Sequence, residues 1–309
     1  MKKDLLSVAD LGRKEIEQLI QEAGDMKREG ASSRLSGRTL ALLFEKPSLR
    51  TRVSFDLAMY QLGGHCVYLS PEEVGLGKRE SVADVARVLS RYVDGIAART
   101  FAQETLNILA SYASVPVINA LSDLEHPCQA LGDFLTIYEK KGKLSGLKLA
   151  FIGDGNNVAN SLLLSACLVG MNFHLACPAG YEFREEVLNQ GKKSAAVSGS
   201  QIQLTNDPDK AAKDADIIYT DVWTSMGQEA EGKKRRADFS GYQVDSRLLS
   251  VAKRNVLFMH PLPVHYGEEI CAGLLDDARS VVFDQAENRL HLQKALLVKL
   301  LSNARIGGK

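Results

Sequence analysis

The residues of this sequence best suited to chemistry are the hydroxyl and guanidinium groups of residues 48–52, Ser-Leu-Arg-Thr-Arg. Pro47 precedes them and favours a helix start, and we expect both arginines to lie on one face of that helix. A helix start offers unpaired backbone N–H groups and a positive dipole end, and guanidinium groups suit phosphate oxygens. The segment therefore predicts an anion site, with a solvated basic turn as the alternative.

A second cationic group, Arg99, ends the apolar run of residues 95–98 and is followed by Thr100. Open α/β sheets bind their ligands at the carboxyl ends of parallel strands. We therefore predict that Arg99 binds a ligand. A surface ion pair is the alternative interpretation.

A third candidate cluster, His126-Pro127-Cys128-Gln129, follows the apolar run of residues 115–119 and opens a predicted helix. His126 and Gln129 are three residues apart and can share one helix face. A single histidine before a helix is more often a cap or a core residue. Because two other clusters end strands in the same half of the chain, a ligand-binding role is favoured.

The second half of the chain carries a carboxylate, Asp221, after the apolar run of residues 217–220. A turn rich in donors follows it, so a second strand-end site is predicted; a loop cap is the alternative. Residues 153–157, Gly-Asp-Gly-Asn-Asn, lie at a strand-to-helix turn and could be mistaken for a dinucleotide fingerprint. They fail that test because Val158 replaces the third glycine and no acidic residue ends the next strand.

Elements of an α/β fold must position these clusters, since short apolar runs alternate with segments of helical period. We expect two domains, each a parallel sheet flanked by helices. The predicted strands are residues 39–44, 66–69, 95–98, 115–119, 148–152, 173–176, 201–204, 217–220, 256–259 and 281–283, and helices are predicted over 16–27, 51–62, 82–92, 104–112 and 129–140.

The domain boundary is expected in the polar stretch of residues 140–146, which separates domains of residues 1–141 and 146–288. A last helix over residues 289–304 has a broad apolar stripe, and we expect residues 289–309 to pack back on the first domain. The basic run of residues 232–236 is interpreted as a solvated loop.

The composition excludes several classes of protein. With 38 basic and 38 acidic residues among 309, the chain has no net positive charge that would attract nucleic acid or an anionic membrane. Recognition of an anion must then come from local clusters, which favours a small ligand. No 18-residue uncharged apolar run and no export signal are apparent. The five cysteines are odd in number and lack a C-x-x-C pair, so we expect reduced thiols, a cytoplasmic location and no metal site.

Residues 48–52, 99–100 and 126–129, in this order and at these intervals, resemble the carbamoyl-phosphate domain of the aspartate and ornithine carbamoyltransferases. The resemblance covers essentially the whole chain. It implies two α/β domains joined by two helices, no cofactor, and a homotrimer or a multiple of trimers with active sites between subunits.

The resemblance also implies roles for single residues. Catalytic roles fall to Arg50, Arg99, His126 and His260. Carbamoyl phosphate would be bound by Ser48, Leu49, Arg50, Thr51, Arg99, His126, Gln129, Pro261, Leu262 and Arg289, with His126 and Gln129 on the carbamoyl group. Cationic and N–H donors can supply this chemistry without a metal.

Residues 221–227, Asp-Val-Trp-Thr-Ser-Met-Gly, resemble the acceptor loop of ornithine carbamoyltransferases. That likeness puts Asp221 on the α-ammonium of L-ornithine, with Ser225 and Met226 as further contacts. In the family the turn of residues 153–157 delivers an asparagine to the substrate carboxylate or backbone, which maps to Asn157. A carboxylate suits a cationic amino acid better than aspartate. The implied reaction carbamoylates the δ-amine; another amine (putrescine, a modified ornithine or aspartate) or a non-catalytic carbamoyl-phosphate-binding paralogue are the alternatives.

Two departures from the ornithine pattern are present. Residues 260–263 read His-Pro-Leu-Pro, where ornithine enzymes usually have His-Cys-Leu-Pro, and Val264 stands where aspartate enzymes have arginine. In the loop of residues 75–81, Gly75 replaces a common glutamine. In the family this loop reaches the active site of a neighbouring subunit, and Lys78 or Arg79 could make that contact here.

Overall fold

The computed structural model describes residues 3–77, 79–225 and 228–302, without the side chain of Glu229. The chain divides into two compact units, residues 1–135 with 287–309 and residues 136–286. Both changes of unit fall inside helices, α6 (Pro127–Lys141) and α12 (Val282–Leu301). None of the described helices has the length and apolarity needed to cross a membrane.

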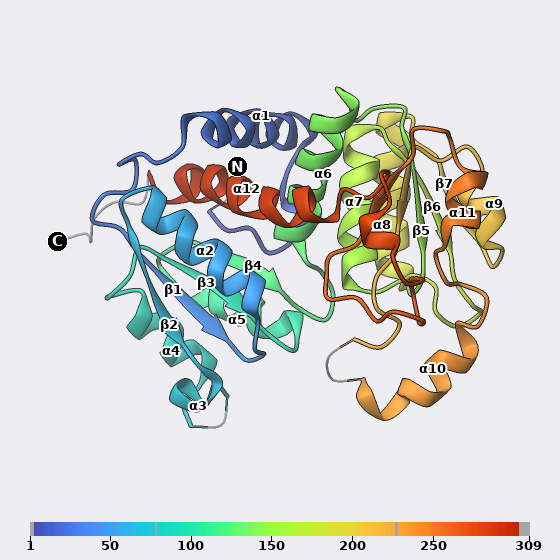
Figure 1. Cartoon of the computed structure of the whole chain (residues 1–309). Helices are drawn as coiled ribbons and strands as arrows, with labels where there is room; N and C mark the ends of the chain where they lie inside the picture. Colours follow the sequence, from blue (N-terminus) through green and yellow to red (C-terminus); the bar gives the residue numbers. More distant parts are fainter. Residues whose placement is uncertain (1–2, 78, 226–227, 303–309) are drawn as a thin grey trace. The chain divides into compact units, whose positions relative to one another are not determined.

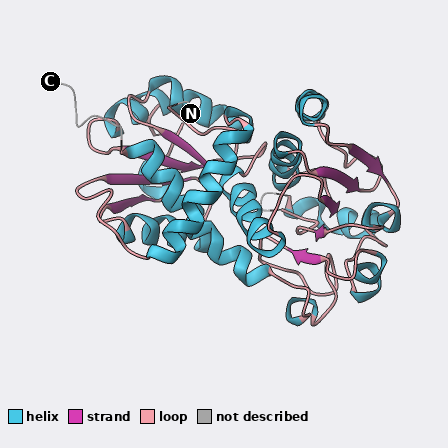
Figure 2. Ribbon diagram, turned by 90° about the horizontal axis from the view of Figure 1, so that it is seen from above, coloured by secondary structure: helices cyan, strands magenta, loops and turns pink. Residues whose placement is uncertain are grey.

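The first unit contains a four-stranded parallel sheet in the order β2-β1-β3-β4. Its two inner strands are buried almost throughout, as expected for a sheet covered on both faces. Figure 2 shows helices on both faces of each sheet, which confirms the predicted fold class. The elements are β1 (Thr39–Phe44), β2 (His65–Leu69), β3 (Gly95–Arg99), β4 (Val117–Leu121), α1 (Arg13–Glu29), α2 (Leu49–Gln61), α3 (Pro71–Val74), α4 (Val82–Leu89) and α5 (Gln103–Tyr112).

The predicted strand over residues 281–283 is wrong, because Val282 and Phe283 begin the long helix α12. The chain just before α12 contacts β9 through a single parallel bridge between Ser280 and Phe258 and through the Val281 N–H, which donates to the Phe258 carbonyl at 3.0 Å. A three-residue apolar run is too short for its period to distinguish a strand from a helix. The last helix therefore starts seven residues before the predicted 289.

Helix α12 runs alongside α1 in the first unit (Figure 1). The fully buried Lys294 donates from Nζ to the backbone oxygens of Met26, at 3.2 Å, and Gly30, at 2.6 Å. A lysine at this position donates to carbonyls at the end of α1, where its positive charge suits the negative end of the helix dipole.

The N-terminal segment covers the free edge of β4. The backbone N–H of Leu5 donates to Val117 at 2.9 Å, and that of Asn119 donates back to Leu5 at 2.8 Å. The carboxylate of Glu125 accepts from the Ser7 hydroxyl and from the Val8 N–H. The segment thereby holds the turn that leads into His126.

The second unit contains a five-stranded parallel sheet in the order β7-β6-β5-β8-β9. Helix α7 begins where Asn156 caps the N–H groups of Val158 and Ala159, and ends at Gly170 in the left-handed region. The elements are β5 (Lys148–Ile152), β6 (Asn172–Ala176), β7 (Ile202–Thr205), β8 (Ile217–Tyr219), β9 (Leu257–Met259), α7 (Asn157–Val169), α8 (Glu185–Ser198), α9 (Pro208–Ala212), α10 (Gly232–Asp238) and α11 (Ser246–Val251).

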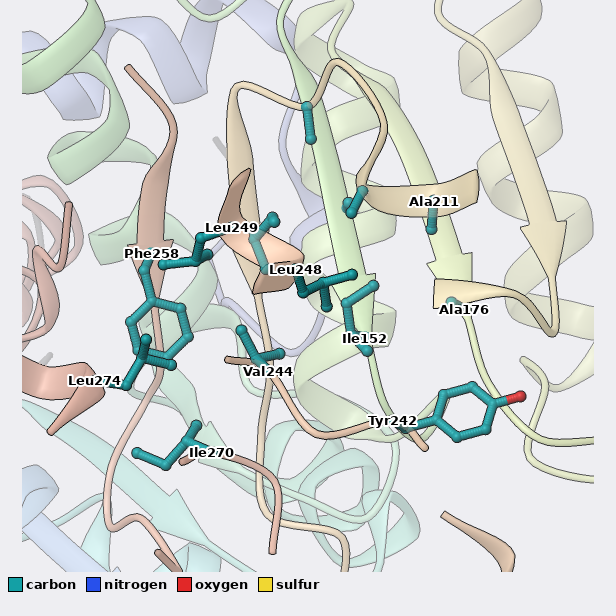
Figure 3. Close-up of a cluster of buried hydrophobic side chains, with 14 of the residues drawn as sticks. Ile152, Ala176, Ala211, Tyr242, Val244, Leu248, Leu249, Phe258, Ile270 and Leu274 are labelled. Atoms are coloured by element: carbon teal, nitrogen blue, oxygen red, sulfur yellow. The ribbon is translucent and has the colours of Figure 1, made fainter. Parts of the chain in front are cut away.

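A hydrophobic core covers one face of this second sheet. Figure 3 shows Leu248 and Leu249 of α11 packed with Phe258 of β9 and Ile152 of β5. The core fixes the strand ends from which the polar side chains of this unit project.

Each sheet has a point where its strand order reverses. In the first sheet the chain moves outward from β1 to β2 and then crosses to β3, so the reversal lies between β1 and β3. In the second sheet it lies between β5 and β8. Ligands of open α/β sheets bind at the carboxyl ends of the strands at such reversals. The topology thus marks one candidate half-site in each unit.

Candidate active site

The predicted anion-binding segment, residues 48–52, follows the carboxyl end of β1. Ser48 caps α2, and its Oγ accepts from the Thr51 N–H at 3.3 Å. The buried Thr51 hydroxyl accepts from Nη2 of Arg289 at 2.7 Å. The structure therefore joins Ser48 and Thr51 to Arg289, a residue of α12 far along the chain.

The prediction that Arg50 and Arg52 share one helix face is wrong. Residues two apart on an α-helix point roughly 200° apart. Arg50 is half-buried and repels the charge of Arg99, whereas the exposed Arg52 stacks on Tyr68 at 3.8 Å from the ring centroid. Arg50 alone of the two belongs to the cationic cluster.

Arg99 ends β3, beside the point where the sheet changes order. Ala98 pairs with Asn119 but Arg99 pairs with Leu121, so a register shift falls at this arginine. Shifts of this kind redirect side chains next to functional sites. Burial, with the charges of Arg289 and Arg50, lowers the pKa of Arg99 to about 10.

Arg50, Arg99 and Arg289 therefore form a cationic cluster, in which the charges of the other two arginines act on Arg99. The buried Nε of Arg99 has no hydrogen-bond partner among the described residues. Gathering like charges in a buried place is unfavourable unless an anion is bound there. The cluster favours a phosphate group.

His126 follows β4 and is almost completely buried. Burial, together with the charges of Arg289 and Arg99, holds its pKa well below the ordinary value. The imidazole is therefore neutral at pH 7 and can donate one hydrogen bond without carrying a charge.

Gln129 lies one turn into α6 and is also buried. Its Nε2 donates to Oδ1 of Asp133 at 2.8 Å, whereas its Oε1 has no partner among the described residues. Gly132 faces Arg289, and a Cβ there would come within 3.3 Å of the Arg289 Cα. This glycine lets α6 approach α12 closely enough to place Arg289 in the cluster.

The second half-site is built on Asp221, which follows β8. Its Oδ2 accepts from Nδ2 of Asn156 at 2.8 Å, and its Oδ1 accepts from the Val222 N–H at 2.8 Å. Burial raises the pKa of Asp221, against the opposing effect of His260. The structure thus puts Asn156 against Asp221, while Asn157 occupies the first position of α7.

His260, Pro261 and Leu262 follow β9. The fully buried His260 accepts at Nδ1 from the Leu262 N–H at 2.9 Å, and its Nε2 lies 3.3 Å from Oε1 of Glu269. Both ring nitrogens thus face protein groups, which favours a positioning role for this histidine. Leu262 has φ of 60°, and the bond to Pro263 is cis.

The basic run of residues 232–236 is a helix, α10, and its interpretation as a solvated loop is wrong. The buried Arg235 donates from Nη1 to Asp154 at 2.6 Å and to the Trp223 carbonyl at 3.0 Å. Its Nε donates to Glu231 at 3.0 Å. Arg235 therefore connects the turn before α7 to the Asp221 loop, a role that the sequence pattern conceals.

Two further predicted residues lie in this acceptor loop. The Ser225 N–H donates to Oε1 of Gln228 at 3.1 Å, so the backbone at Ser225 forms a turn. Met226 lies outside the described residues.

The loop after α3 contains the three predicted in-trans residues. Gly75 ends α3 with φ of 55°, and a Cβ there would lie 2.9 Å from Cβ of Arg79. Glycine therefore fits where glutamine would not without rearrangement. Arg79 is exposed, and Lys78 lies outside the described residues.

A possible metal-binding group occurs away from the cationic cluster. Among the described residues, His265, Glu268 and Glu269 bring ligand atoms within 4.8 Å of one another. Glu269 already accepts from the His265 N–H at 2.6 Å and lies beside His260. Oε1 of Glu269 therefore already has partners within residues 260–269.

The two half-sites define an α/β protein that presents cations to one ligand and a buried carboxylate to another. The chain belongs to the aspartate/ornithine carbamoyltransferase family: residues 3–139 match the family's carbamoyl-phosphate-binding domain, and residues 145–300 match its aspartate/ornithine-binding domain.

Relatives resemble the chain over nearly its full length. An ornithine carbamoyltransferase of Anoxybacillus flavithermus is 54% identical over 97% of this chain and 96% of its own. One of Thermococcus kodakarensis is 50% identical over 98% of each chain. The solved structure of the Pyrococcus furiosus ornithine carbamoyltransferase has a TM-score of 0.94 and 49% identity, covering 98% of both chains.

Proposed function

We propose that this protein is an ornithine carbamoyltransferase. The neutral δ-amine nitrogen of L-ornithine attacks the carbamoyl carbon of carbamoyl phosphate and forms a C–N bond. The carbon–oxygen bond to phosphate breaks, the nitrogen loses a proton, and L-citrulline and phosphate leave. Relatives named for this activity at about half identity support the proposal.

Phosphate is the group best suited to the cationic cluster. Arg50, Arg99 and Arg289 supply charge, and Ser48, Leu49 and Thr51 stand at the start of α2, where N–H groups and the dipole favour an anion. Because the same groups bind the departing phosphate as its charge grows, they stabilise the transition state.

His126 and Gln129 act on the carbamoyl group. A neutral imidazole donates a hydrogen bond to the carbamoyl oxygen as negative charge develops there, and the pKa shift of His126 keeps it in this form. Backbone groups at Pro261 and Leu262 are proposed as further contacts of the carbamoyl group, and His260 fixes that turn through the Leu262 N–H.

The observation that carries the choice of acceptor is the buried carboxylate of Asp221. Its two oxygens accept from Asn156 and Val222, and it stands at the order reversal of the second sheet. A buried carboxylate attracts the α-ammonium of ornithine and repels the side chain of aspartate. Asn157, Ser225 and Met226 are proposed as further ornithine contacts.

Apart from the contacts proposed for Pro261 and Leu262, the two substrates are thus assigned to separate domains. Carbamoyl phosphate goes to residues 1–141 with 289–309, and ornithine goes to residues 146–288. No metal or cofactor has a step in this scheme, in which positioning and electrostatic complementarity provide the catalysis.

We also propose that the protein assembles as a homotrimer or a multiple of trimers. Helix α2 supports this because it exposes an apolar stripe at helical spacing: Leu49 (75% exposed), Val53 (45%), Leu57 (42%) and Tyr60 (75%). Gly75, Lys78 and Arg79 are then available to a neighbouring subunit's site.

A cytoplasmic enzyme of arginine biosynthesis fits these features. All five cysteines are free, three of them buried, which suits a reducing compartment.

A panel of acceptors tests the proposed function. Phosphate release from carbamoyl phosphate should be fastest with L-ornithine and much slower with putrescine or aspartate. A preference for putrescine, a modified ornithine or aspartate would identify a carbamoyltransferase for another amine. Tight binding of carbamoyl phosphate without turnover of any amine would instead identify a non-catalytic paralogue.

A further inference from the structure

The side-chain amide of Gln129 has one end satisfied and one end open. Its Nε2 donates to Oδ1 of Asp133 at 2.8 Å, four residues along the same helix. Gln129 is 1% exposed and Asp133 is fully buried. Oε1 of Gln129 is also buried and has no hydrogen-bond partner among the described residues.

Asp133 determines which end of the amide stays open. Oδ1 of Asp133 accepts a hydrogen bond from Nε2 of Gln129, so the amide nitrogen of Gln129 faces the carboxyl group. The reversed amide would place its oxygen 2.8 Å from that carboxyl oxygen and lose this N–H···O hydrogen bond. The open end of the amide is therefore its oxygen, a hydrogen-bond acceptor.

A buried acceptor without a donor is unfavourable, and a bound ligand can supply the donor. Carbamoyl phosphate carries N–H groups only on its carbamoyl nitrogen. Acetyl phosphate has nearly the same size and the same phosphate group, but a methyl group in that place. A site built around an open acceptor discriminates against the ligand that lacks the N–H.

We propose that Asp133 is a positioning residue that selects carbamoyl phosphate over acyl phosphates by fixing the orientation of the Gln129 amide. The inference rests on the proposed function for the identity of the ligand. Asp133 itself does not touch the ligand; it acts through Gln129.

The test compares the dissociation constants of carbamoyl phosphate, acetyl phosphate and inorganic phosphate for the wild type and Asp133→Asn. Asparagine keeps the shape of the side chain but accepts or donates, so the Gln129 amide can turn over. We expect the wild type to prefer carbamoyl over acetyl phosphate by roughly 10- to 100-fold. In Asp133→Asn the preference for carbamoyl over acetyl phosphate should fall to about threefold or less, because the Gln129 amide is then free to adopt either orientation.

Inorganic phosphate serves as the internal control, because it reaches the arginines but has no group for Gln129. General damage to the fold would weaken all three ligands in parallel and leave the ratio unchanged, which would overturn the proposal. A wild type that binds carbamoyl and acetyl phosphate equally would overturn it as well. If Asp133→Asn failed to fold, Asp133→Ser, whose hydroxyl also accepts or donates, makes the same comparison.

These outcomes are separable from failure of the proposed function. A wild type that binds neither carbamoyl nor acetyl phosphate contradicts the function itself. A wild type that selects carbamoyl phosphate and a variant that keeps this selection contradict only the role of Asp133.

Discussion

Nη1 of Arg235 lies 2.6 Å from Oδ2 of Asp154, two residues before Asn156, which donates to Asp221. Both members of the pair are largely buried, with side-chain exposures of 8% and 13%. The same arginine donates to the Trp223 carbonyl in the acceptor loop. Arg235 therefore holds together the two turns from which the proposed ornithine contacts extend.

Replacing Arg235 by alanine should raise the KM for ornithine by about tenfold or more, because Asp154 is left buried without its cation and Asn156 loses its position. The unfolding free energy should fall by about 3 kcal/mol. Steady-state kinetics with each substrate varied in turn measure the effect, and the dissociation constant of carbamoyl phosphate should stay near the wild-type value.

The neighbouring Arg236→Ala is the matched control, since the Arg236 side chain is 52% exposed and contacts Glu268 only at 3.7 Å. It should behave like the wild type. Equal effects of the two substitutions on the ornithine KM would show that Arg235 has no special positioning role.

Arg99→Met should separate stability from activity. The variant loses a charge-assisted contact to the leaving phosphate. Its kcat/KM should therefore fall by an amount that corresponds to about 3 kcal/mol or more of lost transition-state stabilisation. The ligand-free variant should nevertheless be more stable by up to about 3 kcal/mol, because the pKa of Arg99, lowered to about 10, reports an unfavourable buried charge.

Steady-state kinetics measure the loss in kcat/KM, and thermal unfolding with and without inorganic phosphate measures the change in stability and in phosphate binding. Phosphate should raise the Tm of the wild type clearly and that of the variant only slightly. Near-normal kcat/KM in the variant would remove Arg99 from the proposed phosphate site.

His174 should make the stability of the protein depend on pH below neutrality. Burial and Lys148 lower its pKa from 6.5 to about 4, and its buried Nδ1 has no partner among the described residues. Between these pH values the unfolded chain binds a proton that the folded chain does not. This contribution to stability is therefore complete above pH 6.5 and is lost as the pH falls toward 4.

Urea denaturation of the wild type and His174→Leu between pH 4 and pH 7 measures this dependence. The variant should lose less stability over that range than the wild type. Parallel curves for the two proteins would mean that His174 does not contribute.

Mixed oligomers should test the shared site. If Lys78 or Arg79 enters a neighbouring subunit's phosphate site, a Lys78→Ala/Arg79→Ala variant and an Arg50→Ala variant should each be inactive alone. Dissociating and reassembling them together should restore some activity, because some mixed interfaces then carry intact groups from both subunits. Full activity of the loop variant by itself would exclude a shared site.

Much of the fold was predictable because its signals are local. The run of residues 39–44 is a strand, and Ser48, which directly follows the helix-start signal Pro47, caps the next helix. The strand-end positions of Arg99, His126 and Asp221 followed from the same alternation of strands and helices.

The features that the sequence did not predict depend on contacts between distant residues. Arg235 looked solvated within a basic run, because its partner Asp154 lies 81 positions away. The shared face predicted for Arg50 and Arg52 conflicts with the helical period, which separates residues two apart. Asp133 gave no signal at all, since only the oriented amide of Gln129 reveals its effect.

The central claim is that Asp221 recognises the α-ammonium of ornithine. It is tested most directly by kcat/KM for L-ornithine and Nα-acetylornithine, whose α-nitrogen is uncharged, in the wild type and in Asp221→Asn. The wild type should prefer ornithine by about 100-fold or more, and the variant should lose most of that preference while keeping its affinity for carbamoyl phosphate. An equal loss of activity toward both amines, or a wild type that prefers Nα-acetylornithine, would contradict the account.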